Sequence, residues 1–106
     1  MLYICSMIDW YILRLLYPNV YKLLEKRKSY SHEYLFQFCA DYGLEIRHSN
    51  ENDRNVFSIN DKDVSARYYH DAKTMAIDVA LMMIDYDIDN KKVRGRDKDV
   101  AERIDQ

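Results

Sequence analysis

The side chains that could carry catalysis or bind a metal ion are few and far apart in the chain. They are three histidines and two cysteines: His32, His48, His70, Cys5 and Cys39. A structural zinc site takes four such ligands, usually from closely spaced pairs, and this chain has no CxxC or HxxxH pair. No histidine stands at a spacing that would pair it with a serine or cysteine nucleophile. We therefore predict no metal site, no catalytic residues, two buried and reduced thiols, and no enzymatic activity.

Loops that bind phosphate or calcium are not indicated either. The two glycines, Gly43 and Gly95, are too few and too far apart for a loop that cradles phosphate. Asp85, Asp87 and Asp89 alternate as in a calcium loop but lack its central glycine and closing glutamate. We therefore expect no cofactor and no small-molecule substrate.

The element most clearly predicted by the sequence is a helix over residues 72–84. It contains no glycine or proline, and Ala72, Ala76 and Ala80 recur at every fourth position. Side chains four residues apart stack on one face of a helix, and alanines let that face lie close to a flat partner, usually a β-sheet. Larger apolar residues flank the alanines on both sides, which is typical of a core helix packed on more than one side.

Further helices are predicted before this one. Residues 1–17 are almost continuously apolar and predict a helix with more apolar surface than one small domain can cover. The run is shorter than the ~20 residues that span a bilayer, contains Asp9, and lacks the basic start and cleavage site of a signal peptide. Residues 19–28 predict a short second helix. A third is expected to begin after a cap at Ser29 or Ser31 and to end before Gly43.

Alternating apolar and polar residues between the third and last helices predict three strands. The strands are expected over residues 44–48, 56–59 and 64–69, joined by a polar loop over 49–55 and a tight turn over 60–63.

The predicted fold class is therefore α+β: an α-β-β-β-α order with a three-stranded antiparallel sheet, preceded by one or two extra N-terminal helices. Residues 1–30 would hold the apolar helix and the short helix, residues 31–88 the α-β-β-β-α domain, and residues 89–106 a charged, solvated tail. Alternation also places His48 on the apolar face of the first strand, where we expect a hydrogen-bonded core histidine. His70 would open the last helix.

This order of elements and two motifs resemble a double-stranded-RNA-binding domain over residues 33–87. The last helix resembles the family's alanine-rich helix at Ala72-Lys73, Ala76-Ile77 and Ala80-Leu81. The first helix of the domain and the turn between the second and third strands are also similar, at Leu35, Gln37, Phe38, Gly43-Leu44 and residues 60–64. Residues 1–28 resemble the last helices of a ribonuclease III domain, without that family's acidic signature.

Such domains grip a duplex by its shape, its 2′-hydroxyls and its phosphates. The resemblance implies RNA contacts from Gln37, Arg54, Lys62, Arg67, His70 and Lys73. The chain departs from the family in the loop over 49–55, which carries Glu51 and Asp53 in place of a Gly-Pro and a histidine. Of the lysine cluster that opens the family's last helix, only Lys73 is present.

The distribution of charge favours a protein partner over RNA. The formal net charge is −2, but residues 33–87 hold five basic and eleven acidic residues. Duplex binding draws much of its free energy from counterions released by lysines and arginines at phosphates, and this segment supplies little of it. Duplex RNA binding through a weak basic patch is therefore the alternative reading.

We accordingly predict a non-catalytic interaction module, in an RNA-processing context, that binds a protein partner or a second copy of itself as a homodimer. Ten tyrosines support this reading, because tyrosine is enriched at interfaces. The expected interface residues are Leu2, Tyr3, Trp10, Tyr11, Met75, Val79, Met82 and Tyr86. A further alternative is a small viral or phage inhibitor of a host defence protein, which fits the size and acidity but has no motif behind it. We expect the chain to be intracellular, cytoplasmic or nuclear, and not bound to a membrane.

Overall fold

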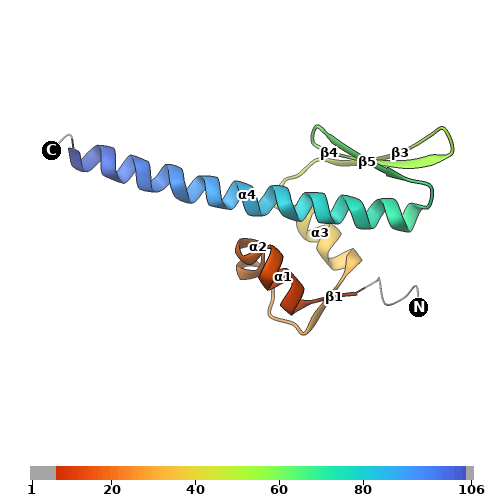
Figure 1. Cartoon of the computed structure of the whole chain (residues 1–106), viewed down its shortest axis with the longest axis horizontal. Helices are drawn as coiled ribbons and strands as arrows, with labels where there is room; N and C mark the ends of the chain where they lie inside the picture. Colours follow the sequence, from red (N-terminus) through yellow and green to blue (C-terminus); the bar gives the residue numbers. More distant parts are fainter. Residues whose placement is uncertain (1–6, 105–106) are drawn as a thin grey trace.

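The computed structural model describes the backbone of residues 7–104 and the side chains of residues 7–91. Figure 1 shows a long helix, α4, that runs between the β3–β4–β5 sheet on one side and the α1–α2 pair on the other. The elements along the chain are β1 (Met7–Asp9), α1 (Trp10–Leu16), α2 (Pro18–Leu23), β2 (Ser29–Ser31), α3 (His32–Tyr42), β3 (Ile46–Glu51), β4 (Arg54–Ile59), β5 (Lys62–Ala66) and α4 (Tyr69–Ile104).

The strands β3, β4 and β5 form a three-stranded antiparallel sheet in that order, which confirms the predicted α+β fold. The predicted polar loop over residues 49–55 is wrong, because β3 and β4 remain paired as far as Glu51 and Arg54. Asn52 and Asp53 alone make the turn, with φ of 53° and 62°. Asparagine and aspartate tolerate this left-handed backbone, which closes hairpins tightly.

The third strand also differs from its prediction over residues 64–69. It begins at Lys62, which pairs with Ile59, and ends at Ala66. The turn before it is therefore only two residues long, with Asn60 at a φ of 53°. The chain bends after Ala66 because α4 already begins at Tyr69.

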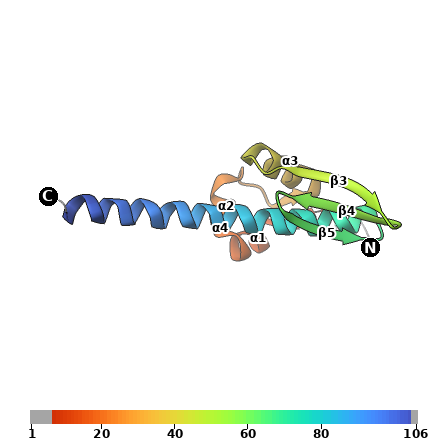
Figure 2. The same ribbon diagram turned by 90° about the horizontal axis from the view of Figure 1, so that it is seen from above.

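The alanine face of α4 is buried as predicted. Ala72, Ala76 and Ala80 are at most 1% exposed, and α4 lies along the centre and one edge of the sheet, on β4 and β5. Figure 2, turned by 90°, shows the same sheet over the first half of α4. Phe57 and Ile59 of β4 are buried in the same core. Small side chains on the helix thus let it approach the sheet closely while larger residues fill the sides.

The helix α3 agrees with its prediction at both ends. The Ser31 hydroxyl accepts a hydrogen bond from the Tyr34 amide at 3.1 Å, which is an N-cap. Gly43 ends the helix with a φ of 120°, a conformation that a residue with a Cβ rarely adopts. Leu35 and Cys39 on its inner face are fully buried. Burial raises the pKa of the Cys39 thiol to about 12, so the thiol stays protonated.

The N-terminal region is less helical than predicted. Within the expected helix over residues 1–17, Met7–Asp9 is instead a strand that pairs with Ser29–Ser31. Residues 1–6, including Leu2, Tyr3 and Cys5, lie outside the described residues. The second helix is also shorter than the predicted 19–28, since it ends at Leu23. The two strands were missed because the residues that pair lie 20 to 24 positions apart in the chain and neither strand alternates strongly.

Most of the segment predicted as a charged, solvated tail over residues 89–106 is helical, because α4 continues to Ile104. Figures 1 and 2 show its C-terminal half extending away from the rest of the molecule. Charged pairs four residues apart stabilise an exposed helix, and Asp87 and Lys91 form such a pair at 3.0 Å. None of the described helices combines the length and the hydropathy needed to cross a membrane.

Candidate protein-interaction face

The candidate site is an apolar surface formed by one side of α4 and by α1. On α4, Met75, Met82 and Tyr86 are 43%, 55% and 68% exposed. On α1, Ile12 and Leu16 are 46% and 55% exposed. We call these five residues the α1–α4 face. A soluble monomer rarely leaves a continuous apolar patch of this kind uncovered, so the face is a candidate for association.

The geometry of α4 explains why these side chains lie together. Positions 75, 79, 82 and 86 are separated by four, three and four residues and so share one helix face. Val79, between them, is half-buried and packs against the core. The sheet covers one neighbouring side of α4 and the α1–α2 pair covers another, which leaves this stripe open.

A shallow apolar groove of about 260 Å³ continues the face where α1 meets α4. Its walls come from Ile8, Ile12 and Leu16 on one side and from Met75 and Leu81 on the other. Tyr17, Thr74 and Asp78 contribute the polar atoms. A groove of this kind can take an apolar side chain from a partner.

A row of aspartates on α4 borders this groove and holds α1 and α2 in place. Asp85 accepts hydrogen bonds from the backbone amides of Asn19, at 2.8 Å, and Val20, at 3.1 Å. It therefore caps the N-terminus of α2 from another element, where the helix dipole favours a negative charge. Asp89 accepts a bond of 2.7 Å from the Asn19 side chain, and Asp78 accepts one from the Tyr17 hydroxyl.

These three carboxylates, Asp78, Asp85 and Asp89, form what we call the acidic strip. Within the described part of the chain, their hydrogen bonds come from neutral donors and no cation lies within ion-pair distance of them. Burial and the bond to Asp78 raise the pKa of Tyr17, which stays a donor. The strip therefore presents carboxylates that no cation of the described side chains pairs, and one of them, Asp78, lines the apolar groove.

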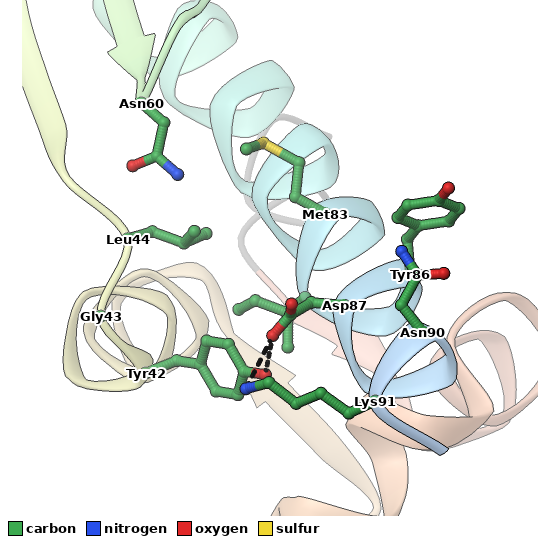
Figure 3. A pocket seen from close by; sticks show the side chains of 10 residues that line it. Tyr42, Gly43, Leu44, Asn60, Met83, Tyr86, Asp87, Asn90 and Lys91 are labelled. Carbon is green, nitrogen blue, oxygen red and sulfur yellow. Dashed lines mark hydrogen bonds and ion pairs between the residues drawn. The ribbon is translucent and has the colours of Figure 1, made fainter. Parts of the chain in front are cut away.

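A second cavity, of about 470 Å³, lies at the other end of the face, between the end of α3 and α4 (Figure 3). In it the Tyr42 hydroxyl donates to Asp87 at 2.7 Å, and the Lys91 ammonium approaches the same carboxylate at 3.0 Å. The bond to Asp87 raises the pKa of both Tyr42 and Lys91. Both stay protonated near neutral pH, so neither can act as a general base there.

The basic residues on the sheet that were expected to contact RNA do not all lie together. Arg54 and Arg67 lie at one end of the sheet, because Asn55 pairs with Ala66. Arg54 is already hydrogen-bonded to Ser65 at 3.4 Å. Lys62 lies at the opposite end of β4, roughly 17 Å away for a six-residue strand.

The remaining RNA candidates are engaged within the fold. Lys73 is 8% exposed, pairs with Glu33, and lies over the ring of Phe36 at 4.8 Å. Gln37 donates to Asp41 at 2.9 Å. The His70 ring packs against His32, with their centroids 5.5 Å apart. The structure thus brings Arg54 and Arg67 to one place, and His70 and Lys73 to another beside His32 and Glu33.

The expectation of a core histidine at position 48 is wrong. The His48 ring does lie on the helix-facing side, 4.8 Å from Phe57, and it hydrogen-bonds to Asn55 at 2.9 Å. The residue is nevertheless exposed, because β3 is an edge strand and α4 packs mainly on β4 and β5. Tyr69 packs edge-on against His48 at 5.1 Å, so an aromatic cluster closes this end of the sheet.

Two of the predicted interface residues, Trp10 and Tyr11, lie on α1 but are not among the five residues of the α1–α4 face. Tyr11 is 62% exposed on α1. Trp10 is half-buried and packs against Tyr11 and Tyr21, with Arg14 over its ring. Ile12 and Leu16 were missed as specific contacts. The apolar run through α1 predicts more apolar surface than the fold can bury. Which side of α1 is buried depends on its packing in the fold, where Leu13 is the buried residue.

The buried His32 predicts a pH dependence of stability. Burial, the neighbouring His70 and Lys73 lower the pKa of His32 in the folded state. The His32 imidazole therefore takes up a proton more readily in the unfolded chain than in the folded one. The free energy of unfolding falls as the pH drops below about 6.5, the ordinary pKa of histidine in an unfolded chain. In urea unfolding at about pH 7.5 and pH 5, we expect His32→Gln to lose less stability on acidification than the wild type. The exposed-site control His48→Gln should lose as much as the wild type; an equal loss in all three would contradict this role.

Within residues 7–91, no three histidine, cysteine, aspartate or glutamate side chains gather closely enough to hold a metal ion. Comparison of the chain with family models, with curated proteins and with solved structures finds no match. The similarity to a double-stranded-RNA-binding domain therefore depends on the residues and the order of elements described above.

Proposed function

We propose that this protein is a non-catalytic interaction module that binds another polypeptide through the α1–α4 face. The observation that carries the proposal is the exposure of Met75, Met82 and Tyr86 in one continuous stripe beside an apolar groove. Unbranched methionines adapt to a partner's shape, and tyrosine buries a large area while keeping a polar tip. These properties suit binding and do not require chemistry at the site.

The charge and placement of the basic residues support this choice over RNA binding. Lys73 is buried against Glu33, and Lys62 lies away from Arg54 and Arg67. Two arginines at one end of a sheet supply few phosphate contacts, whereas duplex affinity grows with the number of cations that meet phosphate. An RNA-processing context would then come from the partner. A role as an inhibitor of another protein would use the same face.

The test is the replacement of Met82 by glutamate. Met82 is 55% exposed, so the variant should fold, while a carboxylate at the centre of an apolar contact is costly to bury. We expect the wild type to associate with increasing concentration in sedimentation velocity or light scattering. Met82→Glu should weaken that association at least about tenfold, equivalent to about 1.4 kcal/mol.

The matched control is Ala40→Glu, which places the same charge on an exposed position of α3, away from the face. It should associate as the wild type does. The proposal would be overturned by a wild-type chain that is a monodisperse monomer at all concentrations and that recovers the same proteins from a lysate as Met82→Glu does.

A further inference from the structure

The C-terminal half of α4 carries a sequence repeat that continues the α1–α4 face. Apolar residues recur at every seventh position: Val79, Tyr86, Val93 and Val100. Residues seven apart lie on nearly the same side of a helix, and α4 is helical throughout this range. A seven-residue apolar repeat of this kind is typical of a helix that pairs with another helix along its length.

The charge of α4 changes sign along its length. Residues 69–90 hold one lysine and five aspartates, whereas residues 91–104 hold six basic and three acidic residues. Two copies of α4 side by side in parallel would place like charges together. In the antiparallel arrangement, the acidic half of each helix lies beside the basic half of the other, which is attractive at both ends.

We propose that a second copy of this chain docks on the α1–α4 face with its α4 antiparallel, related by a two-fold axis. This inference rests on the proposed function and names its partner. A two-fold pair uses the same surface on both copies, so one stripe with an acidic and a basic half is complementary to itself. The segment after position 90, which is basic on balance, would lie along the half of the second copy that carries the acidic strip, whose carboxylates meet only neutral donors in the described part of the chain.

The repeat also sets a register. Placing Met82 opposite Val93 of the second copy puts Met75 opposite Val100 of that copy, because both pairs share one two-fold centre near residues 87 and 88. The same register sets Tyr86 opposite Asp89, where the hydroxyl can donate to the carboxylate. A polar pair in the middle of an apolar seam selects one register at some cost in stability.

Disulfide cross-linking tests the geometry directly, in the full chain with Cys5→Ser and the buried Cys39 retained. We expect Met82→Cys combined with Val93→Cys to give a disulfide-linked dimer under mild oxidation. Met82→Cys alone should give almost none, since the two copies of position 82 would be about 16 Å apart along the axis. A parallel pair would reverse this result and overturn the proposal.

A second pair of variants does not depend on cross-linking. Val93→Glu replaces an apolar residue of the repeat by a carboxylate, so it should weaken dimerisation at least about tenfold. Lys98→Ala, at a position that is not part of the apolar repeat, should weaken dimerisation much less.

These outcomes separate this proposal from the proposed function. If Met82→Glu weakens association but Val93→Glu does not and the cysteine pair fails to link, the antiparallel dimer is overturned and the interaction face stands. A chain that is monomeric alone, but binds a different protein in a Met82-dependent manner, would likewise overturn the dimer and leave the interaction face standing.

Discussion

Replacing Phe57 by alanine is expected to lower the free energy of unfolding by about 3–5 kcal/mol. Phe57 is 1% exposed at the centre of β4 and contacts rings from three elements. Its centroid lies 6.3 Å from Phe36 of α3, 4.8 Å from His48 of β3 and 5.6 Å from Tyr69 of α4. Truncation would leave a cavity where the sheet meets both helices. A loss of this size is a large share of the roughly 5–15 kcal/mol that stabilises a typical domain.

Urea unfolding followed by circular dichroism measures this loss. The matched control is Tyr68→Ala, since Tyr68 is also aromatic and next to α4 but is 62% exposed. We expect the control to cost no more than about 0.5 kcal/mol, as most surface substitutions do. Equal losses in the two variants would mean that β4 is not packed against the helices as described.

Replacing Asp85 by alanine is expected to cost about 2–4 kcal/mol, because it removes the carboxylate that caps α2. The two backbone amides at Asn19 and Val20 would lose their acceptor, and hydrogen bonds to a charged group contribute about 1.5–3 kcal/mol each without adding fully. Asn19 is only 6% exposed, so water would replace these bonds poorly. The loss of structure should be greatest where α1 and α2 pack against α4.

The fluorescence of Trp10, the single tryptophan, reports on that region and complements the overall unfolding curve. Asp85→Asn keeps an acceptor oxygen but loses the charge, so its effect should lie between those of the alanine variant and the wild type. Asp71→Ala removes an exposed carboxylate from the first turn of α4 and should cost less than about 1 kcal/mol. An Asp85→Ala variant as stable as Asp71→Ala would show that α2 does not need this cap.

Features with local causes were predictable. Ser31 and Gly43 mark the ends of α3 through their own side chain and backbone preference, with no help from distant residues. The alanines at positions 72, 76 and 80 identify the buried face of α4 because helix periodicity alone brings them together. The sheet followed from alternation and from turn residues at Asn60 and Asp61.

Features that depend on a distant partner were missed or misplaced. The strand at Met7–Asp9 exists only because it pairs with Ser29–Ser31. The segment over residues 49–55 looks like a loop because both faces of an edge hairpin can be polar. The charged residues after position 88 looked like a tail because exposed helices and disordered segments share a composition rich in charge.

The sequence by itself determined which face of α4 is apolar and where α3 ends, because propensity and periodicity act over one or two turns. Only the tertiary structure decided what each polar side chain does. In the fold, Lys73 is buried beside Glu33, Asp85 accepts hydrogen bonds at the start of α2, and Met82 is exposed. These roles depend on which elements meet, and that is set by packing between residues forty to seventy positions apart.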